Sequence, residues 1–458
     1  MSTPPHVLAL LLALLALAPA APAQDAPAGD DDRIADLERE VEELKNAYGE
    51  LLGIARTLKA QLDDAKAAED QAAAVDEFYI PRQEPDPLGP RTYTGSADNI
   101  YNRPFLTQPS DSVHIGGYID LEFLDPRGDA NKEFDQHRFV PFLYADVSDG
   151  VKVATEVEIE HGSELEVEFA QMDFLVNDHV NLRAGIQLLP LGKLNAVHDS
   201  PIQDLTFRPL VNRYIIPTTL RDAGLGAWGN ITDTIDYQVT VTNGFKGLDN
   251  DGNSAITAAD GLRDASPQAD ELSDPFENLN DKLAWTSRVG WTPELGVEAG
   301  LSALWDTYDE AGDNDLRIVA VDATLHGRAV PLLPDNMELL YEGAWADISR
   351  NNFARTNGVA GNMDGHYVQA NVHFAPDFLD NPEPGGVIED GAHFTFVTRY
   401  GKVALDDYRM RRTTLGLNFR PNETHTVVKL DYLMNDDSGS QQGTNNDNAW
   451  AMSVATYF

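Results

Sequence analysis

From residue 113 onward the chain repeats one pattern, a segment of about ten residues in which apolar and polar side chains alternate. The stretches GVKVATEVEIE (150–160) and TIDYQVTVTNGF (234–245) show it most clearly. Successive side chains of a β-strand point to opposite faces, so each segment has one apolar and one polar face. Sixteen such segments lie between residues 113 and 458, which predicts an all-β fold for this part of the chain.

The connections between these segments alternate in length. Those after even-numbered segments are mostly tight, such as 148–150 and 232–233, whereas those after odd-numbered segments are mostly long and polar, such as 190–221 and 246–279. Short turns at one end and long loops at the other are typical of membrane barrels, and about ten residues let a tilted strand cross a bilayer. We therefore expect a 16-stranded antiparallel transmembrane β-barrel over residues 113–458.

The last segment predicts how the barrel closes, and two other segments predict irregularities in their strands. In the last one, AWAMSVATYF (449–458), large apolar residues alternate with small ones, so the large side chains are expected to face lipid and the small ones the lumen. Pairing of this strand with the first would close the sheet and leave no edge. Segments 165–176 and 315–326 change phase midway, which predicts a β-bulge in each.

The region before residue 113 has a different character. Residues 1–23 hold a short apolar run and a small-x-small site, the pattern of a secretory signal peptide. A heptad of apolar residues from Ile34 to Ala65 predicts a coiled coil within 24–80, with a single amphipathic helix as the alternative. The Pro-rich stretch 81–112 is expected to be a linker. Export followed by β-barrel insertion would place the coiled coil in the periplasm.

The net charge of −42 argues against a nucleic-acid partner, because phosphate binding relies on clustered Lys and Arg. The chain has no Cys, which excludes disulfides and cysteine–metal sites. No segment after the signal peptide approaches 18 consecutive apolar residues, so a membrane span would have to be made of strands.

The stretch LRAGIQLLPLGKLN (182–195) together with LTFRPLVNRYIIPTTLRDAGLGAWGN (205–230) resembles the phosphate-selective porins of the O and P type. The residues that carry this resemblance are Gly185, Pro190, Gly192, Arg208, Leu210, Val211, Arg221, Asp222 and Gly224. The resemblance implies a homotrimeric channel in the outer membrane of a Gram-negative-type envelope, with loop 190–221 folded inward as a constriction. The terminal Phe458 also resembles the assembly signal of bacterial outer-membrane barrels.

Charged residues on the expected lumenal faces bear on selectivity. The basic ones are Arg138, Lys152, Arg183, Arg399 and Lys429, and the acidic ones are Glu156, Glu158, Glu160, Glu298, Glu338 and Glu342. A pore lined by one sign of charge concentrates the opposite ion, and acidic residues here are at least as numerous as basic ones. We therefore expect a water-filled channel for small hydrophilic solutes or ions with an acidic lumen, and we do not carry phosphate over from the resemblance.

The only dense basic group lies on or beside loop 190–221 and comprises Lys193, Arg208, Arg213 and Arg221. It has two interpretations. The four side chains could form a constriction that contacts anions, or they could pair with Asp199, Asp204, Asp222 and the inward glutamates and so hold the loop in place. We favour the second interpretation.

Loop 246–279 contains DNDGNSAITAAD, which has the D-x-[DN]-x-[DN] spacing of a calcium loop. The candidate ligands are Asp249, Asp251, Asn253 and Asp260. Oxygen ligands suit a hard cation, so Ca²⁺ with a structural role is the predicted metal. Ser254 stands where the sharp turn favours Gly, and an ordinary acidic loop is the alternative.

Two other functions are alternatives for a barrel of this kind: hydrolysis and tethering of envelope layers. A barrel hydrolase would need a nucleophile and base such as Ser200 and His198, with Asp199, but three nearly adjacent residues seldom converge and the chain has no Gly-x-Ser-x-Gly turn. We therefore expect no enzymatic activity and no catalytic residues. A tethering barrel that links envelope layers through its coiled coil is the main alternative, and it is compatible with transport.

Overall fold

The computed structural model describes residues 96–97, 107–110, 112–128, 131–379, 382, 386–421, 426–438 and 448–458. All of them belong to the second of two compact units, Glu84–Phe458. The predicted signal peptide (1–23) and coiled coil (24–80) lie outside the described residues, and both stay predictions. Among the described residues, no helix has the length and apolar character needed to cross a membrane.

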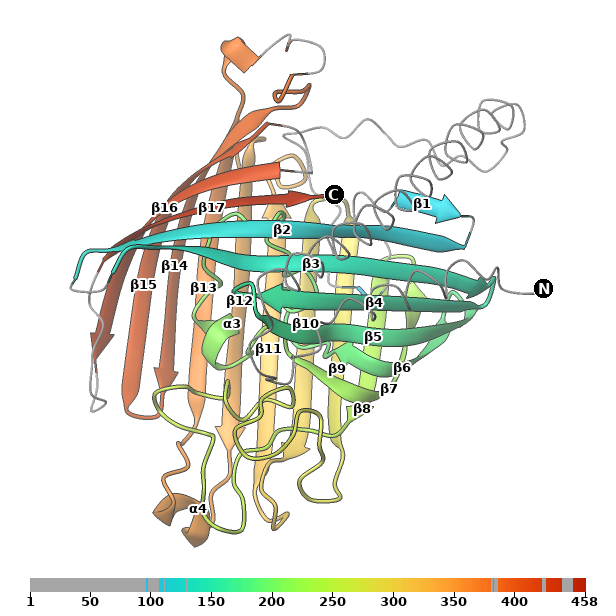
Figure 1. Ribbon diagram of the computed structural model, residues 1–458, viewed down its shortest axis with the longest axis vertical. Coiled ribbons are helices and arrows are strands. Elements are labelled where there is room, and N and C mark those ends of the chain that lie inside the picture. Colours follow the sequence, from blue (N-terminus) through green and yellow to red (C-terminus); the bar gives the residue numbers. More distant parts are fainter. Residues whose placement is uncertain are drawn as a thin grey trace, which may run out of the picture. The chain divides into compact units, whose positions relative to one another are not determined.

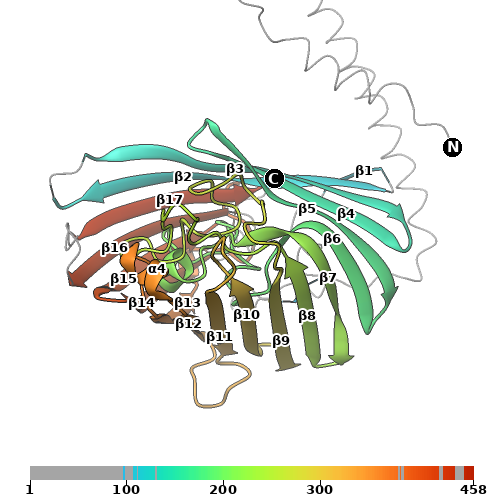
Figure 2. The same ribbon diagram turned by 90° about the horizontal axis from the view of Figure 1, so that it is seen from below.

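Sixteen antiparallel strands form a closed barrel, as the alternation predicts (Figures 1 and 2). They are β2 (Val113–Pro126), β3 (Glu133–Ser148), β4 (Val151–Glu160), β5 (Glu164–Asn177), β6 (Val180–Leu188), β7 (Arg221–Thr232), β8 (Ile235–Thr242), β9 (Ala284–Glu294), β10 (Val297–Thr307), β11 (Asp315–His326), β12 (Met337–Ile348), β13 (Met363–Phe374), β14 (His393–Leu405), β15 (Tyr408–Arg420), β16 (Thr426–Ser438) and β17 (Ala449–Tyr457). Each strand pairs with the next, and β17 pairs with β2, where Tyr457 stands opposite Tyr118. A short strand β1 (Thr107–Ser110), inside the predicted linker, adds to β2.

The predicted bias in loop length is present. One end of the barrel carries mostly tight turns, with 327–336 and 375–392 as the longer exceptions, and the other end carries the two longest connections, 189–220 and 243–283. The loop end also has short connections. For example, only Asp406 and Asp407 join β14 to β15. The helices of the described residues are short. They are α3 (Val211–Tyr214), α4 (Asn352–Thr356) and the 3₁₀ turn η2 (Asp377–Leu379).

The outer face of the barrel is apolar and carries aromatic residues at both ends. Towards the loop end, Trp305 stands opposite Trp285 across the strands, and Trp345 lies two strands away; all three are exposed. At the turn end, Phe374, Phe394 and Phe419 are in register on three adjacent strands, with ring centroids 5.7 and 4.9 Å apart. Two aromatic girdles that flank an apolar band are the expected surface of a membrane barrel.

The last strand is oriented as its alternation predicts. Trp450 and Val454 are exposed on the outer face, whereas Ala451 and Ser453 are buried on the inner face. Small inward residues on this strand leave room for material inside the barrel, and the barrel interior is indeed filled in part by loops (Figure 2).

Only one of the two predicted bulges exists. In β5 the register shifts where Glu156 pairs with Phe169 and the next residue, Val157, pairs with Val167. The prediction for 315–326 was wrong, because β11 pairs without interruption with both neighbours. Its inward residues Leu316 and Ile318 are apolar because they pack against loops inside the barrel, so the change of face is only apparent.

Candidate functional site

The connection between β6 and β7, residues 189–220 (the inward loop), runs inside the barrel (Figure 2). Its apolar residues Leu191, Ile215 and Ile216 are fully buried in a core cluster that includes inward side chains of β10–β15. The helical turn α3 contacts β13 and β14, on the opposite side of the barrel from β6. The inward folding implied by the porin resemblance is therefore present.

Glu342, on β12, is the strongest anchor of this loop. Its Oε2 accepts hydrogen bonds from the backbone N–H groups of Lys193 at 2.9 Å and Leu194 at 3.0 Å, and Oε1 accepts one from the side chain of Asn212. Gly192 stands beside it with φ +72°. A Cβ at this position would lie 2.6 Å from Glu342 Oε1, so the motif glycine is explained both by its backbone conformation and by this close approach.

Polar residues on four further strands hold the rest of the loop. On β15, Asn418 donates to the carbonyl of Asp204 at 2.6 Å; on β16, Asp431 accepts from the backbone N–H of Thr206 at 2.6 Å. The other anchoring bonds are Arg399 to the carbonyl of Phe207, Arg420 to the carbonyl of Pro201, Lys429 to the carbonyl of Ser200, and the Tyr457 hydroxyl to Asp199. The loop is thus fixed to the barrel wall by directional bonds along its length.

A cavity of about 1200 Å³ remains in the lumen. It is bounded by the inner faces of β2–β6, by the inward loop, and by part of loop 243–283. Arg412 on β15 and Lys429 on β16 line it as well, from strands that follow β2 on its other side across β17. Such a volume is ample for hydrated ions and small polar solutes.

Charges of both signs line this cavity. The carboxylates come mainly from β2–β5, whereas the cations are distributed over β3, the inward loop, β7, loop 243–283, β15 and β16. The nine carboxylates are Glu122, Glu133, Asp135, Glu158, Glu160, Glu164, Glu166, Asp264 and Asp270, and the seven cations are Arg138, Arg208, Arg213, Arg221, Arg263, Arg412 and Lys429. The cavity lining is therefore close to charge balance although the whole chain carries −42.

The eight predicted pore-lining residues divide into two groups. Arg138, Glu158, Glu160 and Lys429 line the cavity, and Arg138 pairs with Glu158 at 2.8 Å and with Glu160 at 2.9 Å. The other four are engaged elsewhere: Lys152 pairs with Asp146, Arg183 with Asp173, Glu156 accepts from the Tyr144 hydroxyl, and Arg399 binds Gln369 and the loop.

Glu298, Glu338 and Glu342, which the sequence places on lumenal faces, do not line this cavity either. Glu342 holds the inward loop, Glu298 accepts from Lys193, and Glu338 accepts from Asn371. Their charges are compensated by donors beside them, so counting inward residues along the strands overstates the acidity that a solute meets.

The four predicted constriction residues also differ from one another. Lys193 Nζ lies 2.9 Å from Glu298 Oε2, and Arg221 pairs with Glu166, so both pin the loop or its exit to inward glutamates. Arg208 and Arg213 line the cavity, and among the described residues neither forms an ion pair. The contacts of Lys193 and Arg221 therefore agree with the loop-holding interpretation, and contact with anions by Arg208 and Arg213 stays a prediction.

Arg208 has the most unusual surroundings of the four. One of its guanidinium nitrogens, Nη1, donates to the carbonyl of Thr218, and the other, Nη2, is buried with no hydrogen-bond partner. Burial, together with the nearby positive charge of Arg138, lowers the pKa of Arg208 to about 10. The side chain is still charged at neutral pH, and although it forms no ion pair, the carboxylates of Glu158 and Glu168 lie close enough to act on it.

The predicted calcium residues lie in one loop but do not converge. Asp249 accepts hydrogen bonds from the backbone and side chain of Asn253, at 2.8 and 2.6 Å. Asp260 instead pairs with Arg263 at 2.7 Å and accepts from Thr257. Burial raises the pKa of Asp249, but the hydrogen bonds from Asn253 outweigh this and hold the pKa below its usual value.

The candidate hydrolase residues are part of the inward loop and lie inside the barrel. His198 is fully buried, with Nε2 3.1 Å from Glu168 Oε1 and Nδ1 2.9 Å from the carbonyl of Asn195. Ser200 accepts the Lys429 ammonium through its backbone oxygen. These contacts give the segment a structural role in docking the loop.

Sequence reasoning missed two groups of residues. The first is the set of wall residues that anchor the inward loop, such as Asn418 and Asp431. The second is a pair of histidines, His137 and His161, which lie together with Asp135 on the cavity wall. The dipeptide His161–Gly162 between two alternating segments was the available signal, because such pairs favour tight hairpin turns.

No family model matches the chain. An uncharacterized protein from Aquifex aeolicus (strain VF5) is 31% identical over 218 residues, which are 45% of this chain and 47% of that protein. The chain therefore spans about half the length of this curated relative.

Solved outer-membrane proteins are similar in structure but not in sequence. An anion-selective porin from Comamonas acidovorans is 13% identical, with a TM-score of 0.49 over 76% of this chain and 99% of that chain. The outer-membrane channel DcaP of Acinetobacter baumannii is 11% identical, with a TM-score of 0.49 over 78% and 100%. OprB of Pseudomonas putida is 9% identical, with a TM-score of 0.48 over 76% and 94%. Similarity at this level leaves function to be argued from the residues of the chain itself.

Proposed function

We propose that this protein is an outer-membrane porin, a water-filled channel through which small hydrophilic solutes or ions diffuse. The observation that carries this proposal is the cavity of about 1200 Å³ inside a closed barrel, lined by charged side chains and narrowed by the inward loop. A barrel built for structure alone has no need of a hydrated, charged interior, since buried unpaired charge is costly.

The membrane location rests on the outer face. Exposed Trp, Phe, Leu and Val side chains surround the barrel, and aromatic girdles flank them. Soluble proteins rarely expose contiguous apolar patches of more than a few hundred Å², whereas lipid requires such a surface. These features support insertion in the outer membrane of a Gram-negative-type envelope.

The charge arrangement supports weak rather than strong selectivity. Carboxylates of β2–β5 and arginines of the inward loop line the same cavity, so a solute in it meets charges of both signs. Neither sign dominates, and for this reason we do not assign phosphate as the solute. The relation to phosphate-selective porins of the O and P type stays a prediction, as do the homotrimer and the periplasmic coiled coil.

Planar-bilayer recording across a potassium chloride gradient tests the proposal. A porin gives stepwise conductance increases, in groups of three if the protein is a trimer, and a reversal potential whose sign reports selectivity. A folded barrel that yields no conductance steps would contradict the porin proposal and favour the tethering alternative.

The calcium site also stays a proposal, and it has its own test. Trypsin is expected to cleave after Arg263 more slowly in Ca²⁺ than in EDTA if Asp249, Asp251, Asn253 and Asp260 bind the ion. Binding would require Asp260 to leave Arg263, its present partner at 2.7 Å. Equal cleavage rates in Ca²⁺ and EDTA would leave the segment as an ordinary acidic loop.

A further inference from the structure

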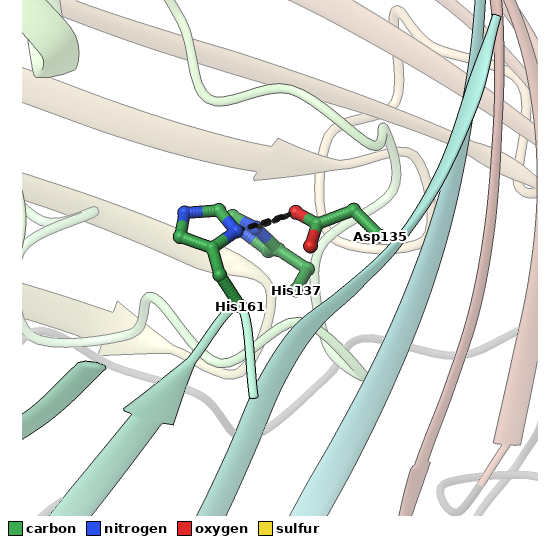
Figure 3. A group of neighbouring side chains, drawn as sticks. All are labelled: Asp135, His137 and His161. Atoms are coloured by element: carbon green, nitrogen blue, oxygen red, sulfur yellow. Dashed lines mark hydrogen bonds and ion pairs between the residues drawn. The ribbon is translucent and has the colours of Figure 1, made fainter. Parts of the chain in front are cut away.

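Two histidines and an aspartate meet on the wall of the cavity, on the side of the acidic strands (Figure 3). His161 Nδ1 lies 2.8 Å from Asp135 Oδ2, and His137 Nδ1 lies 3.6 Å from the same oxygen. One potential ligand atom from each of the three residues lies within 4.8 Å of the others. Figure 3 shows both imidazole rings beside the Asp135 carboxylate.

Local backbone structure brings His161 to this point. His161 and Gly162 have φ values of +51° and +70°, and the N–H of Ser163 donates to the carbonyl of Glu160 at 3.0 Å. Two successive residues with positive φ make the tight hairpin turn that matches the twist of β4 and β5. The turn holds the His161 imidazole over the neighbouring strand β3, where Asp135 lies.

A bulge in β3 places the second histidine. Asp120 pairs with Arg138 and Glu122 pairs with Asp135, so Gln136 and His137 together stand opposite the single residue between them on β2. Gln136 Nε2 donates to the carbonyls of Asp120 and Arg138, the residue pair at one end of the bulge, at 3.0 and 3.2 Å. A bulge re-aims side chains, and here His137, Arg138 and Asp135 all line the cavity.

The donor set determines which ion suits the cluster. Two imidazoles and one carboxylate are the ligands of Zn²⁺ and similar transition-metal ions, whereas Ca²⁺ takes oxygen ligands only. With metal–ligand bonds of about 2.0–2.2 Å, ligand atoms of a tetrahedral zinc site lie about 3.3 Å apart, so only small side-chain movements are needed. The side chains of Asp135, His137 and His161 are 29%, 26% and 47% exposed, which leaves room for water at the open positions.

The surroundings favour a cation. Glu122 Oε1 lies 3.8 Å from His137 Nε2, and Glu160 and Glu164 form a second potential ligand group with His161. Negative charge on the cavity wall raises the local concentration of divalent cations. Arg138 is engaged by its pairs with Glu158 and Glu160, whereas Arg208 and Lys429 of the same cavity also act on His137. The carboxylates directly beside the histidines are therefore what favours a bound cation here.

We propose that Asp135, His137 and His161 bind a divalent transition-metal ion such as Zn²⁺ on the lumenal wall of the barrel. The ion would reach the site through the cavity, and it would place a fixed positive charge among the carboxylates of β2–β5. Metal binding does not depend on conduction, so this inference and the porin proposal are tested separately.

Isothermal titration calorimetry of the refolded full-length barrel with Zn²⁺ tests the site, and Co²⁺ absorption reports its geometry. Wild type is expected to bind one Zn²⁺ at this site. His161→Asn keeps a residue that tolerates positive φ, and it should weaken binding by about tenfold or more, as should His137→Gln. His161 lies in an exposed turn, so His161→Asn is expected to fold normally, which circular dichroism and heat-dependent gel mobility check.

His373→Gln is the matched control. His373 also faces the lumen, close to His326 and His393, with ring centroids 6.5 and 5.9 Å away. Its replacement should leave Zn²⁺ affinity unchanged. Wild-type affinity in folded His161→Asn and His137→Gln, or loss of binding in His373→Gln alone, would overturn the proposal. The absence of a Zn²⁺ titration signal together with an unchanged Co²⁺ spectrum in wild type would do so as well.

Discussion

The carboxylate of Glu342 accepts a hydrogen bond from the backbone N–H of Lys193 at 2.9 Å, which joins residues 149 positions apart in the chain. Glu342 lies on β12 and Lys193 on the inward loop, so this bond fixes the loop against the wall opposite its origin. The same carboxylate holds Leu194 and Asn212. One buried acidic side chain therefore holds three groups of the inward loop at this wall.

Glu342→Gln is expected to loosen the inward loop. The substitution removes the charge and turns one acceptor into a donor that faces other donors. Hydrogen bonds to a charged group contribute about 1.5–3 kcal/mol, so we expect a loss of about 2 kcal/mol in the free energy of unfolding and noisier single-channel currents. Urea unfolding in lipid vesicles and bilayer recording measure the two effects. Glu294→Gln, at an exposed turn, is the control, and equal stability of the two variants would contradict the assigned role.

Gly192→Ala tests the close approach of the loop to Glu342. Gly192 and Gly358 have similar φ values, +72° and +79°, but a Cβ on Gly358 meets nothing within 4 Å. A left-handed conformation is about 1–2 kcal/mol less favourable for alanine than for glycine. The free energy of unfolding of Gly358→Ala should therefore fall by this amount only. Gly192→Ala must also displace Glu342, so its unfolding free energy should fall further. Equal losses in both variants would show that crowding at Glu342 is unimportant.

The strands could be predicted because lipid imposes a simple rule. Each outward position must be apolar, so period-two alternation appears in nearly every segment, and the closure of β17 on β2 follows from the same rule. The rule failed at β11, where Leu316 and Ile318 face the interior. Whether an inward residue is polar or apolar depends on what packs against it inside the barrel. The alternation along one strand contains no information about that packing.

The roles of inward charged residues could not be predicted for a related reason. Lys429 was expected to line the pore, and it does so while also holding the carbonyl of Ser200, 229 positions away. Arg399 binds the carbonyl of Phe207 and does not line the main cavity. Which charges face solvent depends on the path of the inward loop, and that path is set by contacts distant in sequence.

The proximity of His137 and His161 also could not be predicted from local sequence patterns. His137 and His161 lie 24 positions apart, and each is aimed by a local irregularity, a bulge for one and a left-handed turn for the other. The turn at His161–Gly162 could be predicted from the residues, whereas the bulge in β3 does not alter the alternation enough to be predicted.

Phe458→Ala is expected to affect assembly more than stability. The backbone of Phe458 exchanges two hydrogen bonds with Gly117, at 3.1 and 2.9 Å, and these survive the substitution. Its ring stacks on Phe139 with centroids 5.9 Å apart, an interaction worth about 0.5–1.5 kcal/mol. The free energy of unfolding should therefore change little. Because Phe458 resembles the assembly signal of outer-membrane barrels, the amount of folded barrel recovered from membranes should fall clearly. Phe139→Ala is the control, because it removes the same ring contact and leaves Phe458 in place.

Arg208→Gln is expected to shift the channel towards cation selectivity. Arg208 lines the cavity with a buried nitrogen that has no hydrogen-bond partner, so its charge acts on passing ions. Removing one charge at a few ångströms in a partly aqueous site changes ion energies by about 1 kcal/mol, or about fivefold in the permeability ratio. Reversal potentials in a potassium chloride gradient measure this ratio. Arg317→Gln, on the outer face beside Trp305, should leave it unchanged, and an unchanged ratio in Arg208→Gln would mean that Arg208 serves only to hold Thr218 and the loop.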